Sequence, residues 1–237
     1  MTIWYSVVFS LDNSKHYVYM LMMLVASMVK TKSLQEKDTF YVLCDRKTSF
    51  LINSVPNLIK HITLIIKDDP KSVLEGCKWR YELHKHVNVF DKTCCYIDVD
   101  MLCIKTTHIA DLEENQIVVF PEGDSKDSNY SGDMPIKTPI GFTSGFFAYR
   151  VGFDVLAILE DISYKIEQNY NRPQPYYTLD QPYFNKALED KQILLFPSNI
   201  ISFNGNNNMP EAHFINFCGD PGDGNTHLLK MINAIIW

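Results

Sequence analysis

The chain has 237 residues, 46% hydrophobic and 21% charged, with a formal net charge of −6. This length fits one α/β domain or two small ones, and the composition is that of a globular protein with a full core. The negative charge argues against a nucleic-acid-binding protein, which would carry a basic surface. The six cysteines include no Cys-x-x-Cys spacing, which argues against a four-cysteine zinc site and predicts the reduced thiols of a cytoplasmic protein.

Strands and helices alternate along the first half of the chain. β-Branched and aromatic runs predict strands at 3–10, 39–44, 62–66 and 94–102, and longer apolar or amphipathic stretches predict helices at 17–31, 49–55 and 78–89. Polar residues 11–15 are expected to cap the first helix. The alternation predicts an α/β fold in one domain, 1–237, with a mixed, mainly parallel sheet flanked by helices. We expect no signal peptide and no transmembrane segment, because no apolar run is long enough.

The second half of the chain contains a long polar stretch. Predicted strands cover 117–120, 140–150 and 193–196, and predicted helices cover 154–170, 179–188 and the C-terminal residues up to Trp237. Residues 121–139 are rich in Gly, Ser, Asp and Asn and have no apolar period. A loop of this length in a compact domain is commonly a lid or a binding loop. We therefore expect residues 122–137 to close over a bound ligand.

Two acids separated by one residue end the predicted strand at 94–102. Because residues i and i+2 of a strand share a face, roughly 6–7 Å apart, Asp98 and Asp100 project together. The carboxyl ends of strands in an open α/β sheet are where ligands bind. Adjacent carboxylates repel unless a cation or protons neutralise them. The pair therefore predicts a site for Mn²⁺ or Mg²⁺ with positions left open for a diphosphate.

Four other groups of residues could contribute to such a site, although each also has an ordinary structural explanation. His213 could be a third metal ligand, or a structural histidine. The glycines of 219–225 could form an anion-binding nest assisted by Lys230, or a surface turn. Asp180 and Gln181 could hold sugar hydroxyls and stabilise positive charge at an anomeric carbon, or cap a helix. Lys78 and Arg80 could offset a diphosphate, or form a solvated helix face.

Taken in order, these features resemble the glycogenin-like glycosyltransferases of family 8, which have a GT-A fold. The resemblance covers nearly the whole chain and rests on five segments: Val7 to Tyr17, the Lys78/Arg80 helix before the Asp-x-Asp strand, Phe142-Thr143-Ser144-Gly145-Phe146-Phe147, Asp180-Gln181-Pro182-Tyr183-Phe184-Asn185, and His213-Phe214-Ile215 with the glycines and lysine that follow. The chain is also similar to glycosyltransferase domains encoded by large DNA viruses.

The resemblance implies roles for individual residues. It implies that Asp98, Asp100 and His213 bind Mn²⁺ and that Asp180 and Gln181 contact the reacting sugar. It implies donor-binding roles for Phe9, Ser10, Asp12 and Tyr17 at the base and ribose, for Lys78, Arg80, Asp98, Val99, Ser144 and Gly145 near the sugar and diphosphate, and for Gly219, Gly222 and Lys230 at the diphosphate. Gly224 and Asn225 are alternatives to these phosphate ligands, because His213 lies farther from the glycines than in the family.

The activity implied by the resemblance is transfer of a sugar from a nucleotide-sugar, expected to be a UDP-sugar, to a hydroxyl of a glycan, protein or small molecule, with retention. Inversion would need a carboxylate base, for which Asp180 is available. A nucleotidyltransferase is one alternative, although the turn after the first strand has no glycine. A binding module without turnover is the other. The sugar, the acceptor and the oligomeric state stay open.

Overall fold

The structure, a computed structural model, describes residues 1–12, 14–169, 179–203, 211–217 and 224–236. The helices are α1 (His16–Lys30), α2 (Arg46–Asn53), α3 (Pro56–Ile59), α4 (Val73–Lys78), α5 (Ser128–Ser131), α6 (Phe153–Glu167), α7 (Gln181–Leu188) and α8 (Gly224–Ile236), with 3-10 turns at Trp79–Tyr81 and Leu83–Lys85. The strands are β1 (Thr2–Val8), β2 (Thr39–Asp45), β3 (Thr63–Lys67), β4 (Thr93–Ile97), β5 (Met101–Cys103), β6 (Ile117–Asp124), β7 (Ile140–Arg150), β8 (Leu194–Leu195), β9 (Ile201–Phe203) and β10 (Phe214–Asn216).

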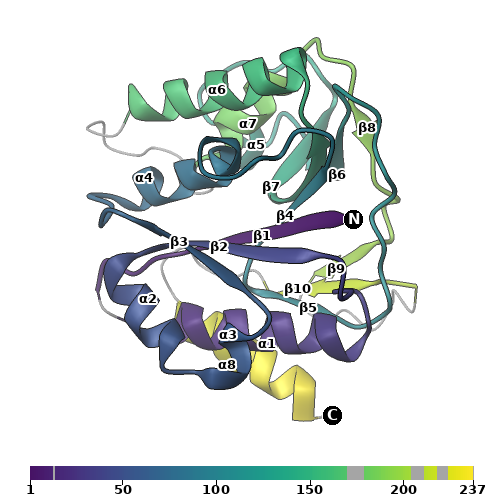
Figure 1. Cartoon of the computed structure of the whole chain (residues 1–237). Coiled ribbons are helices and arrows are strands. Elements are labelled where there is room, and N and C mark those ends of the chain that lie inside the picture. Colours follow the sequence, from purple (N-terminus) through teal and green to yellow (C-terminus); the bar gives the residue numbers. More distant parts are fainter. Residues whose placement is uncertain (13, 170–178, 204–210, 218–223, 237) are drawn as a thin grey trace. The chain divides into compact units, whose positions relative to one another are not determined.

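The strands form two sheets (Figure 1). Seven lie in the order β3-β2-β1-β4-β7-β6-β8, and three in the order β5-β10-β9. Strand β2 is parallel to β3, β6 is parallel to β8, and β6 is antiparallel to β7. The predicted fold class, a mixed and mainly parallel sheet flanked by helices, is confirmed. None of the helices in the described part of the chain is long and apolar enough to span a membrane.

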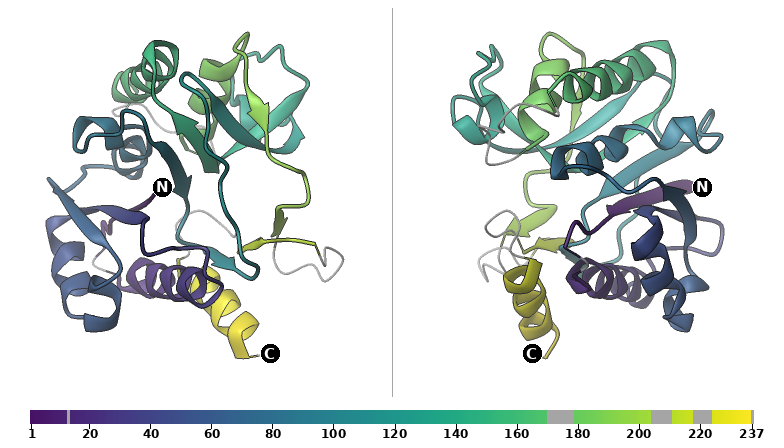
Figure 2. Two further views of the ribbon diagram at one scale, coloured as in Figure 1. Left: turned by 45° about the vertical axis from the view of Figure 1, so that its right-hand side comes forward. Right: turned by 90° about the vertical axis from the view of Figure 1, so that its left-hand side faces the viewer.

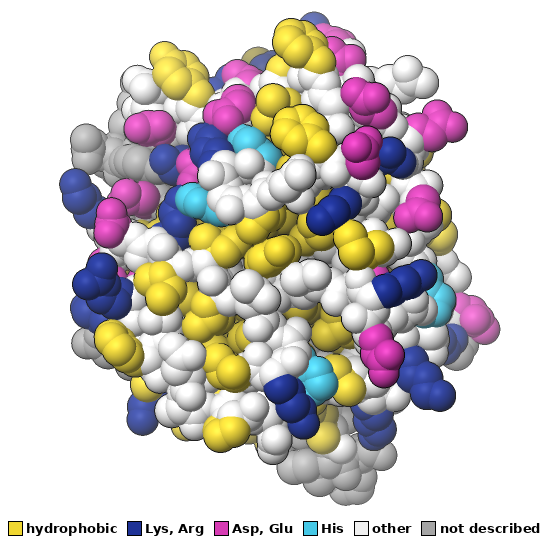
Figure 3. Space-filling model, viewed as in Figure 1, with side chains coloured by type: hydrophobic (Ala, Val, Ile, Leu, Met, Phe, Trp, Pro, Cys, Tyr) yellow, Lys and Arg dark blue, Asp and Glu magenta, His cyan; other side chains and the backbone are white. Residues whose placement is uncertain are grey.

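The chain divides into two compact units, which we describe separately. Unit 1 contains residues 1–3, 70–96 and 110–198, and unit 2 contains residues 4–69, 97–109 and 199–237. On the face shown in Figure 3, Lys and Arg side chains are intermixed with Asp and Glu side chains.

In unit 2, helix α1 packs against α8, as Figures 1 and 2 show. Its buried face carries Leu21, Leu24 and Met28, each 0% exposed, at the spacing of an amphipathic helix. Among the described residues of 11–15, which leave out residue 13, no side-chain hydrogen bond caps this helix. The Asp12 carboxylate instead accepts from the backbone N–H of Ser14, 3.0 Å away, in a local turn.

In unit 1, strands β6 and β7 form an antiparallel pair, and helices α6 and α7 contact each other. The central residues of β7, Phe146 to Tyr149, are 0% exposed. A strand buried on both faces reads as a continuous apolar run, which is why the sequence predicted β7 with its observed bounds.

Two predicted helices have different bounds in the structure. The helix expected at 78–89 is wrong, because two 3-10 turns occupy 79–81 and 83–85 and the α-helix α4 precedes them. Helix α4 begins at Val73, where the Ser72 hydroxyl accepts from the Glu75 N–H, at 3.1 Å. The helix expected at 49–55 is α2, which begins at Arg46 because Asp45 caps it by accepting from the Thr48 N–H, at 2.7 Å. These capping signals fix helix starts more precisely than apolar periodicity.

Candidate functional site

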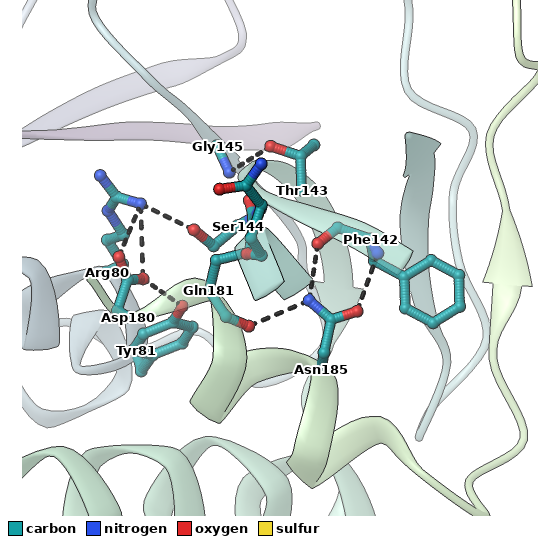
Figure 4. Close-up of polar contacts among 10 residues, drawn as sticks. Arg80, Tyr81, Phe142, Thr143, Ser144, Gly145, Asp180, Gln181 and Asn185 are labelled. Carbon is teal, nitrogen blue, oxygen red and sulfur yellow. Dashed lines mark hydrogen bonds and ion pairs between the residues drawn. The ribbon is translucent and has the colours of Figure 1, made fainter. Parts of the chain in front are cut away.

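A buried ion pair in unit 1 connects the 3-10 turn after α4 to the start of α7 (Figure 4). Arg80 Nη1 donates to both carboxylate oxygens of Asp180, at 3.2 and 3.4 Å, and to Ser144 Oγ, at 3.0 Å. The Arg80 guanidinium also lies over the Tyr96 ring, 5.3 Å from its centroid. The Asp180 side chain is 2% exposed and that of Arg80 is 17% exposed. The Arg80 side chain is therefore the more exposed member of the pair.

A tyrosine supplies a further donor to this carboxylate. The Tyr81 hydroxyl donates to Asp180 Oδ2 at 2.6 Å, and its ring stacks on Phe147 and Phe184 with centroid distances of 5.8 and 6.0 Å. Burial, together with the negative charge of Asp180, raises the pKa of Tyr81 well above its ordinary value. The hydroxyl therefore keeps its proton, and Asp180 is held by donors from two side chains.

The first residues of α7 also fasten this helix to β7 (Figure 4). Gln181 Oε1 accepts from the Ser144 N–H, and Gln181 Nε2 donates to the Asn129 carbonyl, each at 3.0 Å. The Asn185 carboxamide accepts from the Phe142 N–H and donates to the Phe142 carbonyl, each at 2.8 Å, as a neighbouring strand would. Both polar atoms of the Gln181 side chain are therefore engaged within the protein. Contact of Gln181 with a sugar stays a prediction.

The segment expected to be a long loop, 121–139, has structure of its own. Strand β6 continues to Asp124, and helix α5 follows. The Tyr130 ring of α5 lies on the backbone of Gly123 and Gly141, so closely that a Cβ atom on Gly141 would be 2.3 Å from its Cγ. Lys186 of α7 donates to the Pro135 carbonyl at 2.8 Å. The loop prediction is wrong, and closure over a ligand would have to break these contacts.

One ionisable residue that the sequence did not indicate lies beside Thr143 of β7. The Glu122 carboxylate of β6 accepts hydrogen bonds from the Thr143 and Tyr130 hydroxyls, and burial nevertheless raises its pKa above the ordinary value of 4.5. Glu122 lies in the polar stretch that we expected to be a loop, where a glutamate gives no signal. Only the folded structure shows that the Glu122 carboxylate is buried and bonded to Tyr130.

The raised pKa of Glu122 predicts a pH-dependent effect of the substitution Glu122→Gln. The folded protein binds the Glu122 proton more tightly than the unfolded chain does, so the contribution of Glu122 to wild-type stability is greatest below pH 4.5 and is lost as the pH rises through the folded-state pKa. Glutamine does not titrate. We therefore expect the variant to gain stability relative to wild type across this window, as measured by urea unfolding from pH 4 to 8. A pH-independent difference would contradict the expectation.

In unit 2, the acid pair follows β4 directly. Asp98 and Asp100 are partly buried. Asp100 Oδ2 lies 3.1 Å from Nδ1 of His227, a residue of α8. Asp100 Oδ1 is buried and has no hydrogen-bond partner among the described residues. A buried carboxylate oxygen with no donor is costly unless a cation compensates it.

The structure does not bring His213 to the acid pair, which corrects the predicted ligand set. The Phe217 N–H donates to the Asp100 carbonyl at 2.9 Å, whereas the Ile104 N–H donates to the His213 carbonyl at 2.8 Å. Three residue pairs of an antiparallel ladder lie between these contacts, which are therefore four residue steps, or about 13 Å, apart along the strands. His213 Nδ1 instead lies 2.9 Å from Thr107 Oγ1. His213 is therefore a structural histidine at the far end of β10.

The predicted base and ribose residues follow β1. The Ser10 N–H donates to Asp45 Oδ2 at 3.0 Å, and the Ser10 hydroxyl donates to Asp12 Oδ1 at 2.9 Å. The hydrogen bond from the backbone of Ser14, followed by that from the Ser10 hydroxyl, lowers the pKa of Asp12. The exposed Asp12 carboxylate is thus ionised and held in place beside Ser10. Phe9 and Tyr17 lie in the same unit, each partly buried.

The structure describes some of the other residues predicted to bind the nucleotide-sugar, but not all of them. Gly219 and Gly222 lie outside the described residues. Lys230 is on α8, partly buried and three residues after His227. Lys78 pairs with Glu82 and Glu167 at 3.4 and 3.8 Å. Val99, which stands between the two acids in the sequence, is buried. The Gly145 N–H donates to Thr143 Oγ1 at 3.2 Å.

Comparisons with known proteins identify the fold. No protein-family model matches the chain, and no curated protein matches it in sequence. Among solved structures, the chain is similar to the galactosyltransferase LgtC in complex with donor and acceptor sugar analogs. The match has a TM-score of 0.62 and 12% sequence identity, and it covers 98% of this chain and 96% of LgtC. The chain has a GT-A fold. The GT-A fold predicted from the sequence is thus confirmed.

GT-A glycosyltransferases typically use a divalent metal. The described residues contain no group of three or more His, Cys, Asp or Glu side chains placed to hold an ion. The Oδ1 of Asp100 nevertheless fits a cation, because it is a buried anionic oxygen that receives no donor from the part of the chain that the structure describes. Asp98 and Asp100 are therefore suitable oxygen ligands for Mn²⁺ or Mg²⁺.

Proposed function

We propose that the chain is a metal-dependent glycosyltransferase, with residues 1–237 acting as a single GT-A domain. It would move a sugar from a nucleotide-sugar, a UDP-sugar in our proposal, to a hydroxyl of a glycan, protein or small molecule, with retention. The observation that carries the proposal is a GT-A fold over the whole chain with an acid pair directly after β4. A cytoplasmic location agrees with the buried free thiols among the described residues and stays a prediction.

Unit 2 supplies the residues proposed for the metal and nucleotide. Asp98 and Asp100 would hold the divalent ion, which when bound supplies positive charge that stabilises a leaving diphosphate. The ordered turn after β1 would bind the base and ribose, with the Asp12 carboxylate and Ser10 hydroxyl already fixed by mutual hydrogen bonding. Phe9, Tyr17 and Val99 would complete the nucleotide contacts, and Lys230 with the glycines at 219 and 222 would contact the diphosphate.

Unit 1 supplies the residues proposed for the sugar. Departure of the diphosphate leaves an oxocarbenium-like sugar. Arg80 is the more exposed member of its ion pair, and Ser144 and Gly145 lie on β7 beside it. Asp180 is buried and would hold the Arg80 guanidinium in place. Its negative charge would also offset part of the positive charge that Arg80 presents to the sugar. Gln181 would keep the Ser144 backbone in position.

A donor-hydrolysis screen tests the proposal. The protein is incubated with UDP-, GDP- and TDP-sugars in Mn²⁺ or EDTA, beside Asp100→Ala and the control Asp68→Ala, which changes an exposed acid of unit 2. We expect Mn²⁺-dependent release of one nucleoside diphosphate, reduced at least about 100-fold in Asp100→Ala and unchanged in Asp68→Ala. Release of pyrophosphate from a nucleoside triphosphate and a sugar phosphate would instead indicate a nucleotidyltransferase. Thermal stabilisation by a nucleotide-sugar without any turnover, even with acceptors present, would indicate a binding module.

A further inference from the structure

A second histidine, which no sequence motif singles out, lies beside Asp100 of the acid pair. His227 is in the first turn of α8, and its Nδ1 is 3.1 Å from Asp100 Oδ2. The two side chains are 14% and 18% exposed. Helix α8 packs against α1 within unit 2, so the position of His227 is set by the same unit that carries Asp98 and Asp100.

Two buried acceptor oxygens belong to residues at this end of the β5/β10 ladder. Asp100 Oδ1 and Asn216 Oδ1 are both buried without a hydrogen-bond partner among the described residues. Asn216 is 6% exposed and lies directly opposite Met101, the residue after Asp100, in the β5/β10 ladder. Buried oxygens almost always receive a donor or a cation. The described residues supply no donor to either oxygen, so each is available to a group outside them.

The distance between His227 and Asp100 suits two ligands of one ion. Adjacent ligands of an octahedral ion with bonds of about 2.1 Å are separated by about 3.0 Å. The observed 3.1 Å between Nδ1 and Oδ2 matches this separation. One imidazole among oxygen ligands also suits a transition-metal ion better than Mg²⁺ or Ca²⁺, which prefer oxygen throughout.

We propose that His227 is the nitrogen ligand of the divalent metal beside Asp100, in the place that the sequence assigned to His213, and that the amide oxygen of Asn216 is available to the same ion. The inference rests on the proposed function, because it concerns the metal of that site. It also gives α8 a defined role. His227 and Lys230 are three residues apart and share one face of the helix, so one helix would present a metal ligand and a cation for the diphosphate.

Mn²⁺ binding by the full chain tests this assignment without requiring turnover. Free Mn²⁺ is followed by its EPR signal during titration of the wild type and of Asp100→Ala, His227→Ala, His227→Gln, Asn216→Ala and His213→Ala. We expect binding to be lost in Asp100→Ala and weakened at least about tenfold in both His227 variants. Asn216→Ala should weaken it less. His213→Ala, the matched control, should bind Mn²⁺ as the wild type does.

The nature of the contact is tested by pulsed EPR of the bound Mn²⁺. Nitrogen coupling should be present in the wild type, should change when histidine is labelled with ¹⁵N, and should be absent in His227→Gln, which can still donate a hydrogen bond to Asp100. The wild-type spectrum does not depend on whether a variant folds. Coupling that persists in His227→Gln, or disappears in His213→Ala, would overturn the assignment while leaving the metal site in place. Absence of Mn²⁺ binding by the wild type would overturn both the assignment and the proposed metal dependence.

Discussion

Replacing Arg80 with methionine is expected to lower the free energy of unfolding by about 3–5 kcal/mol. Methionine preserves much of the side-chain length, so the main loss is the guanidinium that pairs with Asp180 at 3.2 Å. The Asp180 side chain is 2% exposed and would keep only the Tyr81 hydroxyl as a side-chain donor among the contacts described above. Urea unfolding of the wild type and Arg80→Met at one pH measures the difference.

The double variant Arg80→Met/Asp180→Asn identifies the cause. Removing the charge of Asp180 removes the penalty of leaving it unpaired, so the double variant should be more stable than Arg80→Met alone. The exposed pair Lys165–Asp161, at 2.6 Å, is the control, because Lys165→Met should cost less than about 1 kcal/mol. A small effect of Arg80→Met, or a double variant as unstable as the sum of the single ones, would show that the pair does not hold this part of the fold.

The strands were predictable because their apolar runs carry most of the information about burial. Strand β7 was predicted with its observed bounds, since eleven residues from Ile140 to Arg150 form a continuous strand-like run. The start of α4 and the existence of α5 were not predicted. Both depend on single side chains, Ser72 at the cap of α4 and Tyr130 on two glycines, rather than on periodicity. Such contacts are specific to the folded structure.

The candidate site was likewise only partly predictable from the sequence. The acid pair was found from its position after an apolar run, but the strand predicted at 94–102 is wrong in its bounds. Strand β4 ends at Ile97 and β5 begins at Met101, so Asp98 and Asp100 lie in the turn between them and the i, i+2 geometry of a strand does not apply. The choice between His213 and His227 could not be made from spacing, since it depends on the direction in which β10 runs past β5. Antiparallel pairing carries His213 away from Asp100, and the helix that follows returns His227 to it. Similarly, nothing local to Gln181 shows that its carboxamide is already bound to Ser144 and Asn129.

The substitution Gly141→Ala is expected to destabilise the protein by about 3 kcal/mol, the upper end for overpacking. The new Cβ would lie 2.3 Å from Cγ of Tyr130 and 2.6 Å from Cδ1, so the ring must leave its place on β6 and β7. Tyr130 is 8% exposed, and its displacement would loosen the whole segment that we expected to be a lid. Urea unfolding measures the cost, and limited proteolysis within residues 122–137 measures the loosening.

Changes at Tyr130 determine whether this ring is the cause. In a Tyr130→Ala background, Gly141→Ala should be nearly neutral, because the methyl group then meets empty space. In a Tyr130→Phe background it should cost as much as in the wild type, because the ring remains and only the hydroxyl that reaches Glu122 is lost. This pattern separates steric exclusion from a backbone effect of alanine, which would be the same in all three backgrounds. Equal costs in the three backgrounds would therefore show that the Tyr130 ring does not hold this segment on the strand pair.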